Sequence, residues 1–331
     1  MKRILLVATG GTIASRPTAT GLTPMITSRE ILEFVPETAE ICQVDTRQIA
    51  NIDSTNMNAA HWLDMVRTIQ AEYDRYDGFV ISHGTDTMAY TAAALSYLIQ
   101  HSPKPIVLTG SQKSIFLRDT DARTNLINAF RYAADGRAHG VSLVFDGLVI
   151  DGTRARKMRT KSFNAFSSMD FPELGVMREG QFLQYISDPA PLGPPAFTTA
   201  LNDRVFVLKL IPGMDASVFQ WLRGHYDALV IESFGVGGIP CAGDEGFLTA
   251  IGDWVSSGKV IVMTTQVPHE GSDMTVYQVG YQVKERYGIL EAYDMTLEAI
   301  VTKLMWILGQ TRDVERIRSR FYQPVQHDLI R

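Results

Sequence analysis

The chain alternates between short apolar runs and longer segments in which apolar positions recur with helical spacing. Near-continuous runs rich in Val and Ile are typical of parallel strands that are covered on both faces. These runs lie at residues 4–8, 78–82, 106–109, 141–145, 205–210, 228–231 and 260–264. The helical patterns between them lie at residues 59–73, 87–100, 120–134, 215–224, 246–256 and 296–308. This alternation predicts an α/β fold with mostly parallel sheets.

Residues 187–202 interrupt the alternation, because they contain four prolines and one glycine but few periodic apolar positions. Such a composition is typical of a segment that crosses a surface between two domains. We therefore predict a larger N-terminal α/β domain at 1–186, a linker at 187–202 and a C-terminal α/β domain at 203–331.

The composition favours a globular protein that acts on a small molecule. With 331 residues, of which 45% are hydrophobic, the chain can bury a full core without disulfides or metals. Its net charge of -5 provides no basic face, so we expect no nucleic-acid or membrane partner. No stretch approaches the ~20 apolar residues of a membrane helix, and the first apolar run is too short for a secretion signal. A cytoplasmic protein is therefore expected.

The two cysteines, Cys42 and Cys241, lie far apart in the sequence and have no histidine-rich neighbourhood. This spacing indicates neither a disulfide framework nor a metal site, and we expect two buried thiols.

The first candidate loop, Ala8-Thr9-Gly10-Gly11-Thr12-Ile13, directly follows the first apolar run. Ligands of open parallel sheets bind beyond the carboxyl ends of the strands, so polar residues at this place are candidate site residues. The paired glycines let the backbone approach a ligand closely, and Thr12 is the candidate nucleophile. An ordinary glycine turn is the alternative. The loop matches neither of the glycine-rich nucleotide-binding fingerprints.

The second loop, Ser82-His83-Gly84-Thr85-Asp86-Thr87, follows another apolar run and precedes an alanine-rich helix. Asp86 or Thr87 alone would be explained as a helix N-cap, but a cap does not account for the whole cluster. His83 is disfavoured as a catalytic base, because adjacent positions of an extended segment point to opposite sides.

Residues 151–161, Asp-Gly-Thr-Arg-Ala-Arg-Lys-Met-Arg-Thr-Lys, are strongly basic within an acidic chain. A solvated loop is one interpretation, and an RNA-contacting patch is another, although the interleaved aromatic residues of such patches are missing. A desolvated lysine with cationic neighbours can instead lose its proton and act as a base. The polar residues 50–58 fit a turn with a helix cap, or hydroxyls that hold a carboxylate.

Taken together, these segments resemble the bacterial-type L-asparaginase family, specifically its cytoplasmic type I branch. The resemblance spans essentially the whole chain, and its most specific motifs are at residues 9–13, 53–57, 76–91 and 109–112. It implies a flavodoxin-like N-terminal parallel-sheet domain and a smaller C-terminal α/β domain. It also implies a homodimer or homotetramer with active sites between subunits, and no metal or organic cofactor.

The resemblance further implies a role for individual residues. Thr12 would form an acyl-enzyme with the substrate, and Thr85, Asp86 and Lys157 would form a triad that activates the nucleophile or the hydrolytic water. Asp86 would also receive the substrate α-ammonium group, and Ser54 its α-carboxylate. The residues implied to bind substrate are Gly11, Asp53, Ser54, Thr55, Gly84 and Gln278.

Two positions depart from the family pattern within the implied active site. Leu22 stands where relatives commonly have a tyrosine in a mobile loop. Gln278 stands where many relatives supply a glutamate from an adjacent subunit, and it keeps the size but loses the charge. Glu270 or Glu285 would be close enough in sequence to compensate.

A further departure concerns regulation. Some type I members have a second, allosteric asparagine site that uses an arginine and a cysteine. This chain has Glu232 and Val267 at those positions, so we predict no allostery of that kind.

The expected reaction is hydrolysis of L-asparagine to L-aspartate and ammonia. Glutaminase activity is an alternative, because one methylene changes discrimination by only ~10- to 200-fold. A non-catalytic asparagine sensor is a second alternative, which the two departures in the active site favour and the intact triad opposes. An amidase component of a tRNA-dependent amidotransferase is disfavoured, because such proteins carry an additional N-terminal domain, whereas Thr12 follows the first predicted strand.

Overall fold

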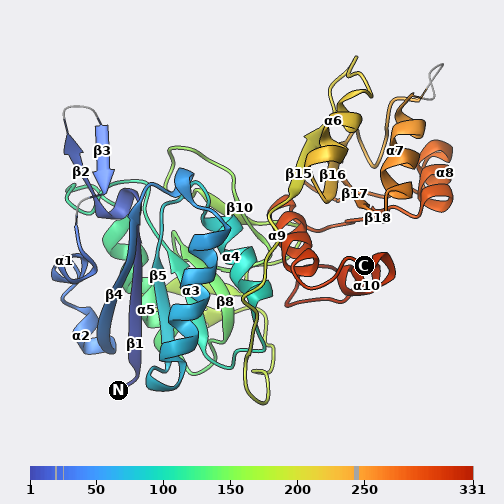
Figure 1. The fold of residues 1–331 in the computed structure, drawn as a ribbon. Helices are drawn as coiled ribbons and strands as arrows, with labels where there is room; N and C mark the ends of the chain where they lie inside the picture. Colours follow the sequence, from blue (N-terminus) through green and yellow to red (C-terminus); the bar gives the residue numbers. More distant parts are fainter. Residues whose placement is uncertain (19–20, 25, 242–245, 331) are drawn as a thin grey trace. The chain divides into compact units, whose positions relative to one another are not determined.

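The computed structural model describes residues 1–18, 21–24, 26–241 and 246–330. The chain forms two compact units, Met1–Thr199 and Ala200–Arg331, which are described one by one (Figure 1). The division falls inside the proposed linker at 187–202. Part of that linker, β14 (Ala196–Phe197), pairs with β6 (Ile99–Gln100) of the first unit.

The first unit is built on five parallel strands, in the spatial order β4-β1-β5-β7-β8. They are β1 (Arg3–Gly10), β4 (Gln43–Ile52), β5 (Gly78–Ser82), β7 (Pro105–Thr109) and β8 (Gly140–Phe145). Numbered by their place in the chain, these strands follow the order 2-1-3-4-5, which is the flavodoxin-like order. The predicted α/β fold is thereby confirmed.

Antiparallel strands extend this sheet to the full order β13-β12-β9-β8-β7-β5-β1-β4. Two further strand pairs stand apart from it, namely β2 with β3 and β10 with β11. The apolar runs did not predict these short strands. Their bounds are β2 (Ser15–Thr18), β3 (Gly21–Pro24), β9 (Leu148–Asp151), β10 (Ala155–Lys157), β11 (Phe166–Ser168), β12 (Gly175–Arg178) and β13 (Gln181–Gln184).

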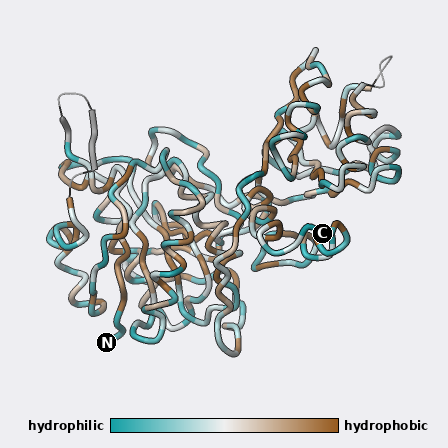
Figure 2. Tube along the Cα trace, in the orientation of Figure 1, coloured by the Kyte–Doolittle hydropathy of each residue, from teal (hydrophilic) through white to brown (hydrophobic). Residues whose placement is uncertain are grey.

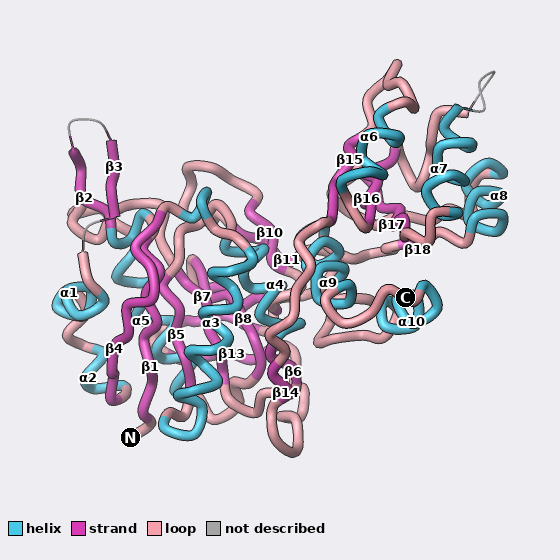
Figure 3. The backbone as a smooth tube through the Cα atoms, viewed as in Figure 1, coloured by secondary structure: helices cyan, strands magenta, loops and turns pink. Residues whose placement is uncertain are grey.

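Helices cover both faces of the sheet, with α2 against α5 on one face and α3 against α4 on the other (Figures 1 and 3). Helix α4 is alanine-rich, and all its residues except Tyr90 are buried, which explains its lack of a polar face. The helices are α1 (Ser28–Glu33), α2 (Thr38–Ile41), α3 (Ala59–Glu72), α4 (Met88–Leu98) and α5 (Ala122–Ala134), with 3-10 turns η1 (Thr12–Ala14), η2 (Ser54–Asn56) and η3 (Tyr73–Arg75).

The core of the first unit lies along the apolar runs, which Figure 2 shows as hydrophobic stretches in the sheet. Ile4, Leu6, Val80 and Val107 are all 0% exposed and belong to one cluster. Burying a Val, Leu or Ile side chain contributes roughly 1.5–3 kcal/mol, so these strands contribute substantially to the stability of the unit.

The second unit contains a smaller parallel sheet in the order β15-β16-β17-β18. Its strands are β15 (Val205–Lys209), β16 (Ala228–Ser233), β17 (Val260–Thr265) and β18 (Leu290–Glu291). Its helices are α6 (Val218–His225), α7 (Gly246–Ser256), α8 (Gln278–Tyr287), α9 (Leu297–Leu308) and α10 (Val314–Phe321). The predicted smaller C-terminal α/β unit is thus confirmed.

Within the second unit, a buried ion pair joins the C-terminal segment of the chain to α9. The Nζ of Lys303, on α9, lies 2.6 Å from Oδ2 of Asp328, and both side chains are 0% exposed. Lys303 also donates to the carbonyl of Gln323 at 2.9 Å, and Asp328 accepts from the amide of Val325 at 3.0 Å. Burial lowers the pKa of Lys303, while Asp328 acts in the opposite direction.

Removing one member of this pair should destabilise the protein strongly. We expect Lys303→Met to lower the free energy of unfolding by about 3–5 kcal/mol, because it leaves the Asp328 carboxylate buried without a counter-charge. Urea unfolding at neutral pH measures the loss. Arg67→Met, which breaks the exposed pair of Arg67 with Asp64 on α3, is the control and should cost at most about 1 kcal/mol. The double variant Lys303→Met/Asp328→Leu should recover much of the loss, and an undiminished loss would contradict the explanation by charge.

Candidate active site

The candidate site lies where the order of the parallel strands reverses. Strand β1 has β4 on one side and β5 on the other. The chain after β1 leads to β4 and the chain after β5 leads to β7, so the two connections leave neighbouring strand ends in opposite directions. Such a switch point opens the crevice in which flavodoxin-like sheets bind ligands. The loop after β1 carries Gly11 and Thr12, and the loop after β5 carries Gly84, Thr85 and Asp86.

Glycines hold these loops against each other. Gly11 has φ 81°, and a Cβ atom there would overlap the backbone of Gly84. A Cβ atom on Gly84 would in turn lie 2.5 Å from the Oγ of Ser54. No side chain fits at either glycine, so three separate motifs meet at this point. Thr12, half-buried at the start of η1, directly follows the contact.

The predicted triad is assembled in the structure. The Nζ of Lys157 donates to Oγ1 of Thr85 at 2.7 Å and lies 2.6 Å from Oδ1 of Asp86. The Lys157 side chain is 15% exposed and that of Asp86 is 57% exposed, so the pair lies at the surface rather than in the core. Lys157 is the last residue of β10, where it pairs with Phe166 of β11.

The polar segment 53–55 forms the short turn η2. Oδ1 of Asp53 accepts from the backbone amide of Thr55 at 2.9 Å and from its hydroxyl at 3.0 Å. Ser54 is 3% exposed, and its carbonyl accepts from the hydroxyl of Thr87 at 2.8 Å. The capping interpretation of this segment therefore holds for Asp53, while Ser54 faces Gly84 at the switch point.

His83 is completely buried and both its ring nitrogens are occupied. Nδ1 lies 2.7 Å from the carbonyl of Gly84, and Nε2 lies 2.9 Å from the hydroxyl of Thr91, which also accepts from Trp62. Burial lowers the pKa of His83 to about 4. This environment favours a neutral, structural imidazole and agrees with the prediction that His83 is not the base.

The remaining predicted residue, Gln278, lies in the second unit, where it is exposed at the start of α8. Glu285 is exposed on the same helix, two turns further on, and Glu270 is exposed before it. Glu232, at one of the two positions that bear on allostery, is buried in β16. The side chain of Leu22 lies outside the described part of the structure.

One residue of the cluster had no role in the sequence prediction. Gln112, in the loop after β7, accepts a hydrogen bond from Thr85 Oγ1 at 3.2 Å. The motif 109–112 pointed to the segment, but nothing in its pattern identified the glutamine as a partner of the triad.

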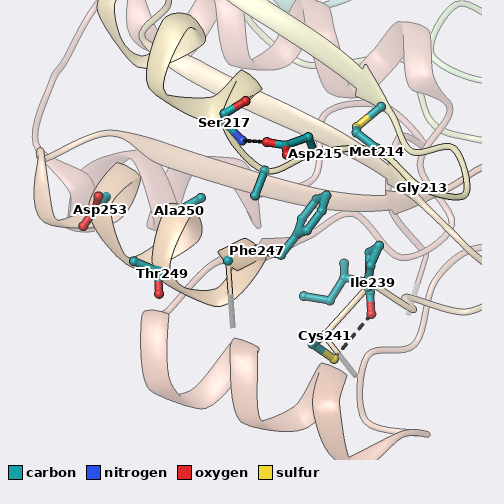
Figure 4. Close-up of a pocket in the computed structure, with 13 residues that line it drawn as sticks. Gly213, Met214, Asp215, Ser217, Ile239, Cys241, Phe247, Thr249, Ala250 and Asp253 are labelled. Carbon is teal, nitrogen blue, oxygen red and sulfur yellow. Dashed lines mark hydrogen bonds between the residues drawn. The ribbon is translucent and has the colours of Figure 1, made fainter. Parts of the chain in front are cut away.

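A large cavity elsewhere in the chain lacks the predicted site residues. It has a volume of about 1000 Å³, and thirteen residues of the second unit line it (Figure 4). Asp215 accepts there from the amide of Ser217 at 2.7 Å, and the thiol of Cys241 contacts the carbonyl of Ile239 at 3.5 Å. These polar groups bond to the local backbone, so the cavity offers no alternative to the candidate site at the switch point.

Cys42 is buried, but Cys241 is only partly buried, so the expectation of two buried thiols was wrong for Cys241.

In the part of the chain that the structure describes, no three His, Cys, Asp or Glu side chains are grouped to hold a metal ion. Over the same residues, no helix has both the length and the apolar character required to cross a membrane.

Two family models match the chain. The model for the N-terminal domain of asparaginase matches residues 3–190, and the model for the glutaminase/asparaginase C-terminal domain matches residues 204–321.

Curated relatives match over nearly the full chain. The L-asparaginase of Thermococcus kodakarensis is 38% identical over 318 residues, which cover 96% of each chain. L-asparaginase 1 of Escherichia coli strain K12 is 33% identical and covers 99% of this chain and 98% of its own. A glutamyl-tRNA(Gln) amidotransferase component of Pyrococcus furiosus is 35% identical, and the match covers 96% of this chain and 74% of that relative.

Solved structures show the same fold. The thermostable L-asparaginase from Thermococcus kodakarensis superposes with a TM-score of 0.93 at 36% identity, over 99% of both chains. A probable cytoplasmic L-asparaginase from Campylobacter jejuni gives a TM-score of 0.83 at 26% identity, over 97% of this chain and 99% of its own.

The burial of His83 predicts a specific pH dependence of stability. The pKa of His83 is about 4 in the folded state and 6.5 ordinarily, so the unfolded chain binds more protons between these values. The stabilisation that this histidine provides is therefore complete above pH 6.5 and is lost as the pH falls towards 4, by about 3 kcal/mol in total.

Unfolding of wild type and His83→Asn between pH 7.5 and 4.5 tests this prediction. The variant should be less stable at pH 7.5, and the difference should narrow as the pH falls. His225→Asn, which changes an exposed histidine of α6, is the control for the substitution itself. A constant difference between wild type and His83→Asn would contradict a buried neutral imidazole.

Proposed function

Because this chain belongs to the asparaginase family, we propose that it hydrolyses the side-chain amide of free L-asparagine, with Thr12 as the nucleophile. The family models and the relatives confirm the resemblance to the bacterial-type asparaginases, including a type I enzyme. The same family models and relatives show that the chain is a hydrolase that acts on an amide.

One observation carries the proposal for the site. Lys157 contacts both Thr85 and Asp86 within 2.7 Å. Thr85 and Asp86 belong to the loop after β5, in which Gly84 packs against Gly11. A basic group, a hydroxyl and a carboxylate therefore meet next to the loop of Thr12. This is the set of groups that a weakly nucleophilic threonine hydroxyl requires for its activation.

In the proposed reaction, Oγ1 of Thr12 attacks the carbonyl carbon of the substrate side chain and gives up its proton. The C–N bond breaks, the nitrogen takes up a proton and leaves as ammonia, and an ester to Thr12 remains. Water then attacks this ester, which releases L-aspartate and restores the hydroxyl. We propose that Lys157, with Thr85 and Asp86, accepts and returns the proton at Thr12 or at the attacking water. Backbone amides near Thr12 and Thr85 would stabilise the oxyanion.

We assign substrate binding to the residues around the two glycines. Asp86 is exposed and has one carboxylate oxygen beyond its contact with Lys157, so it can receive the α-ammonium group. Ser54 is proposed for the α-carboxylate, with Asp53 and Thr55 closing the pocket. Gly11 and Gly84 would allow the substrate to approach the backbone.

The remaining parts of the proposal concern assembly and location. We propose a homodimer or homotetramer in which Gln278 of an adjacent protomer contacts the substrate. The protein would be cytoplasmic, would need no cofactor, and would show some activity on L-glutamine because the two substrates differ by one methylene.

The first prediction from this proposal concerns the nucleophile. We expect Thr12→Ala to abolish ammonia release from L-asparagine while the protein stays folded and still binds asparagine, since only a hydroxyl and a methyl group are removed. Coupled detection of ammonia with L-asparagine and L-glutamine measures the activity. Thr249→Ala, which changes an exposed threonine of α7, should keep wild-type activity. Binding of asparagine without ammonia release by the wild-type protein would indicate a sensor instead.

The second prediction concerns the base. Lys157→Met should lower kcat by roughly 100- to 10,000-fold, the usual contribution of a general acid–base group. Lys161→Met changes an exposed lysine of the same basic segment and should leave kcat unchanged. Steady-state ammonia release by both purified variants is the measurement, and near wild-type activity of Lys157→Met would remove this lysine from the mechanism.

A further inference from the structure

Gln112 joins three segments of the first unit that are distant in sequence. Its Oε1 accepts from the hydroxyl of Thr85 at 3.2 Å. Its Nε2 donates to the carbonyl of Ser162 at 3.1 Å and makes a longer contact with the carbonyl of Arg159 at 3.4 Å. One side-chain amide therefore touches the triad and also ties down the segment that follows Lys157.

We propose that Gln112 is a positioning residue for the reaction, which fixes the hydroxyl of Thr85 so that a lone pair faces Lys157. The inference rests on the proposed function, because it assigns a role within the same triad. Gln112 would act through Thr85 and need not touch the substrate.

The count of donors and acceptors supports this role. The ammonium form of Lys157 only donates, and the neutral amine that would act as the base still has two N–H donors for Thr85 and Asp86, so the hydroxyl of Thr85 accepts in its contact with Lys157. The single hydroxyl proton of Thr85 then needs another acceptor, and Oε1 of Gln112 provides it. The hydrogen bonds run in one direction, from Lys157 through Thr85 to Gln112, so the orientation of the hydroxyl is fixed before substrate arrives.

The orientation of the Gln112 amide is fixed in turn by its other contacts. The carbonyls of Ser162 and Arg159 can only accept, so the nitrogen of the amide must face them. The oxygen must then face Thr85. A glutamate would place a carboxylate against the same carbonyls, and an asparagine would be too short to reach both sides.

The backbone of Gln112 is held by a buried carboxylate. Asp121 is 8% exposed and accepts from the amides of Gln112 at 2.8 Å and Lys113 at 3.0 Å. Asn125 donates to Asp121 at 3.3 Å and to the carbonyl of Gly110 at 3.0 Å. Since the main chain is already ordered, only the rotamer entropy of the side chain is lost when the amide makes its contacts.

The decisive experiment is a double-mutant cycle on kcat for ammonia release from L-asparagine. Gln112→Met keeps the length of the side chain but removes the strong donor and acceptor. We expect kcat to fall about 5- to 50-fold, the effect of one or two hydrogen bonds lost from the transition state, with KM within about twofold of wild type. Thr85→Val and the double variant Thr85→Val/Gln112→Met complete the cycle.

The cycle distinguishes action through Thr85 from a structural effect. If Gln112 acts through the Thr85 hydroxyl, adding Gln112→Met to Thr85→Val should lower kcat by less than about twofold. Independent losses that multiply would overturn the inference, as would a wild-type kcat in Gln112→Met alone. If Gln112→Met does not fold, Gln112→Asn takes its place, because the shorter amide also loses the contact with Thr85.

Two controls complete the experiment. Lys113→Met changes the neighbouring residue, whose ammonium pairs with Asp119, and should keep the wild-type kcat. Wild-type protein that releases no ammonia from L-asparagine would refute the proposed function itself, whereas an active wild type with an equally active Gln112→Met would refute only the role of Gln112.

Discussion

The contact between Gly11 and Gly84 is the constraint on which the candidate site depends. Strands β1 and β5 are neighbours in a parallel sheet, about 4.8 Å apart, so the loops that leave their ends begin side by side. Only backbone without a Cβ atom fits at both positions, and Gly11 additionally requires a positive φ. The residues that follow, Thr12 and Thr85, are thereby brought to the same crevice although they lie more than seventy positions apart.

Lys157 reaches this crevice by a different route. The parallel order ends at β8, and the chain turns back through β9 before it enters β10. The pairing of β10 with β11 holds Lys157 at the end of its strand, with its ammonium group against Thr85 and Asp86. Because Asp86 is more than half exposed, the ion pair contributes little to stability. The contact is therefore better explained by a role in the proposed reaction than by a contribution to the stability of the fold.

The sequence predicted those parts of the molecule that depend on local pattern. Strands β5 and β7 are buried on both faces and appear as plain apolar runs, whereas none of the ten described residues of β4 is fully buried, and that strand went undetected. Edge strands exposed on one side have no apolar run to reveal them. The assembly of Thr85, Asp86 and Lys157 was expected only from family resemblance, since no spacing rule connects residues 85 and 157. Gln112 was missed because its role depends on three tertiary contacts that leave no trace in local sequence.

The two units share one structural device but differ in the loops that follow their strands. In each, a lysine just before a strand donates to two carbonyls three residues apart: Lys104 to those of Tyr73 and Tyr76, and Lys259 to those of Arg223 and Tyr226. Carbonyls at helix ends lack partners within the helix, so a lysine provides the missing donor in both units.

The loops that follow β5 and β16, the strands before these lysines, differ however. After β5 the chain reads His83-Gly84-Thr85-Asp86, and after β16 it reads Phe234-Gly235-Val236-Gly237, which has no side chain that can accept or donate a proton. The shared scaffold therefore sets where a site can form, and the side chains of the loop after β5 favour the first unit as the place of the proposed triad.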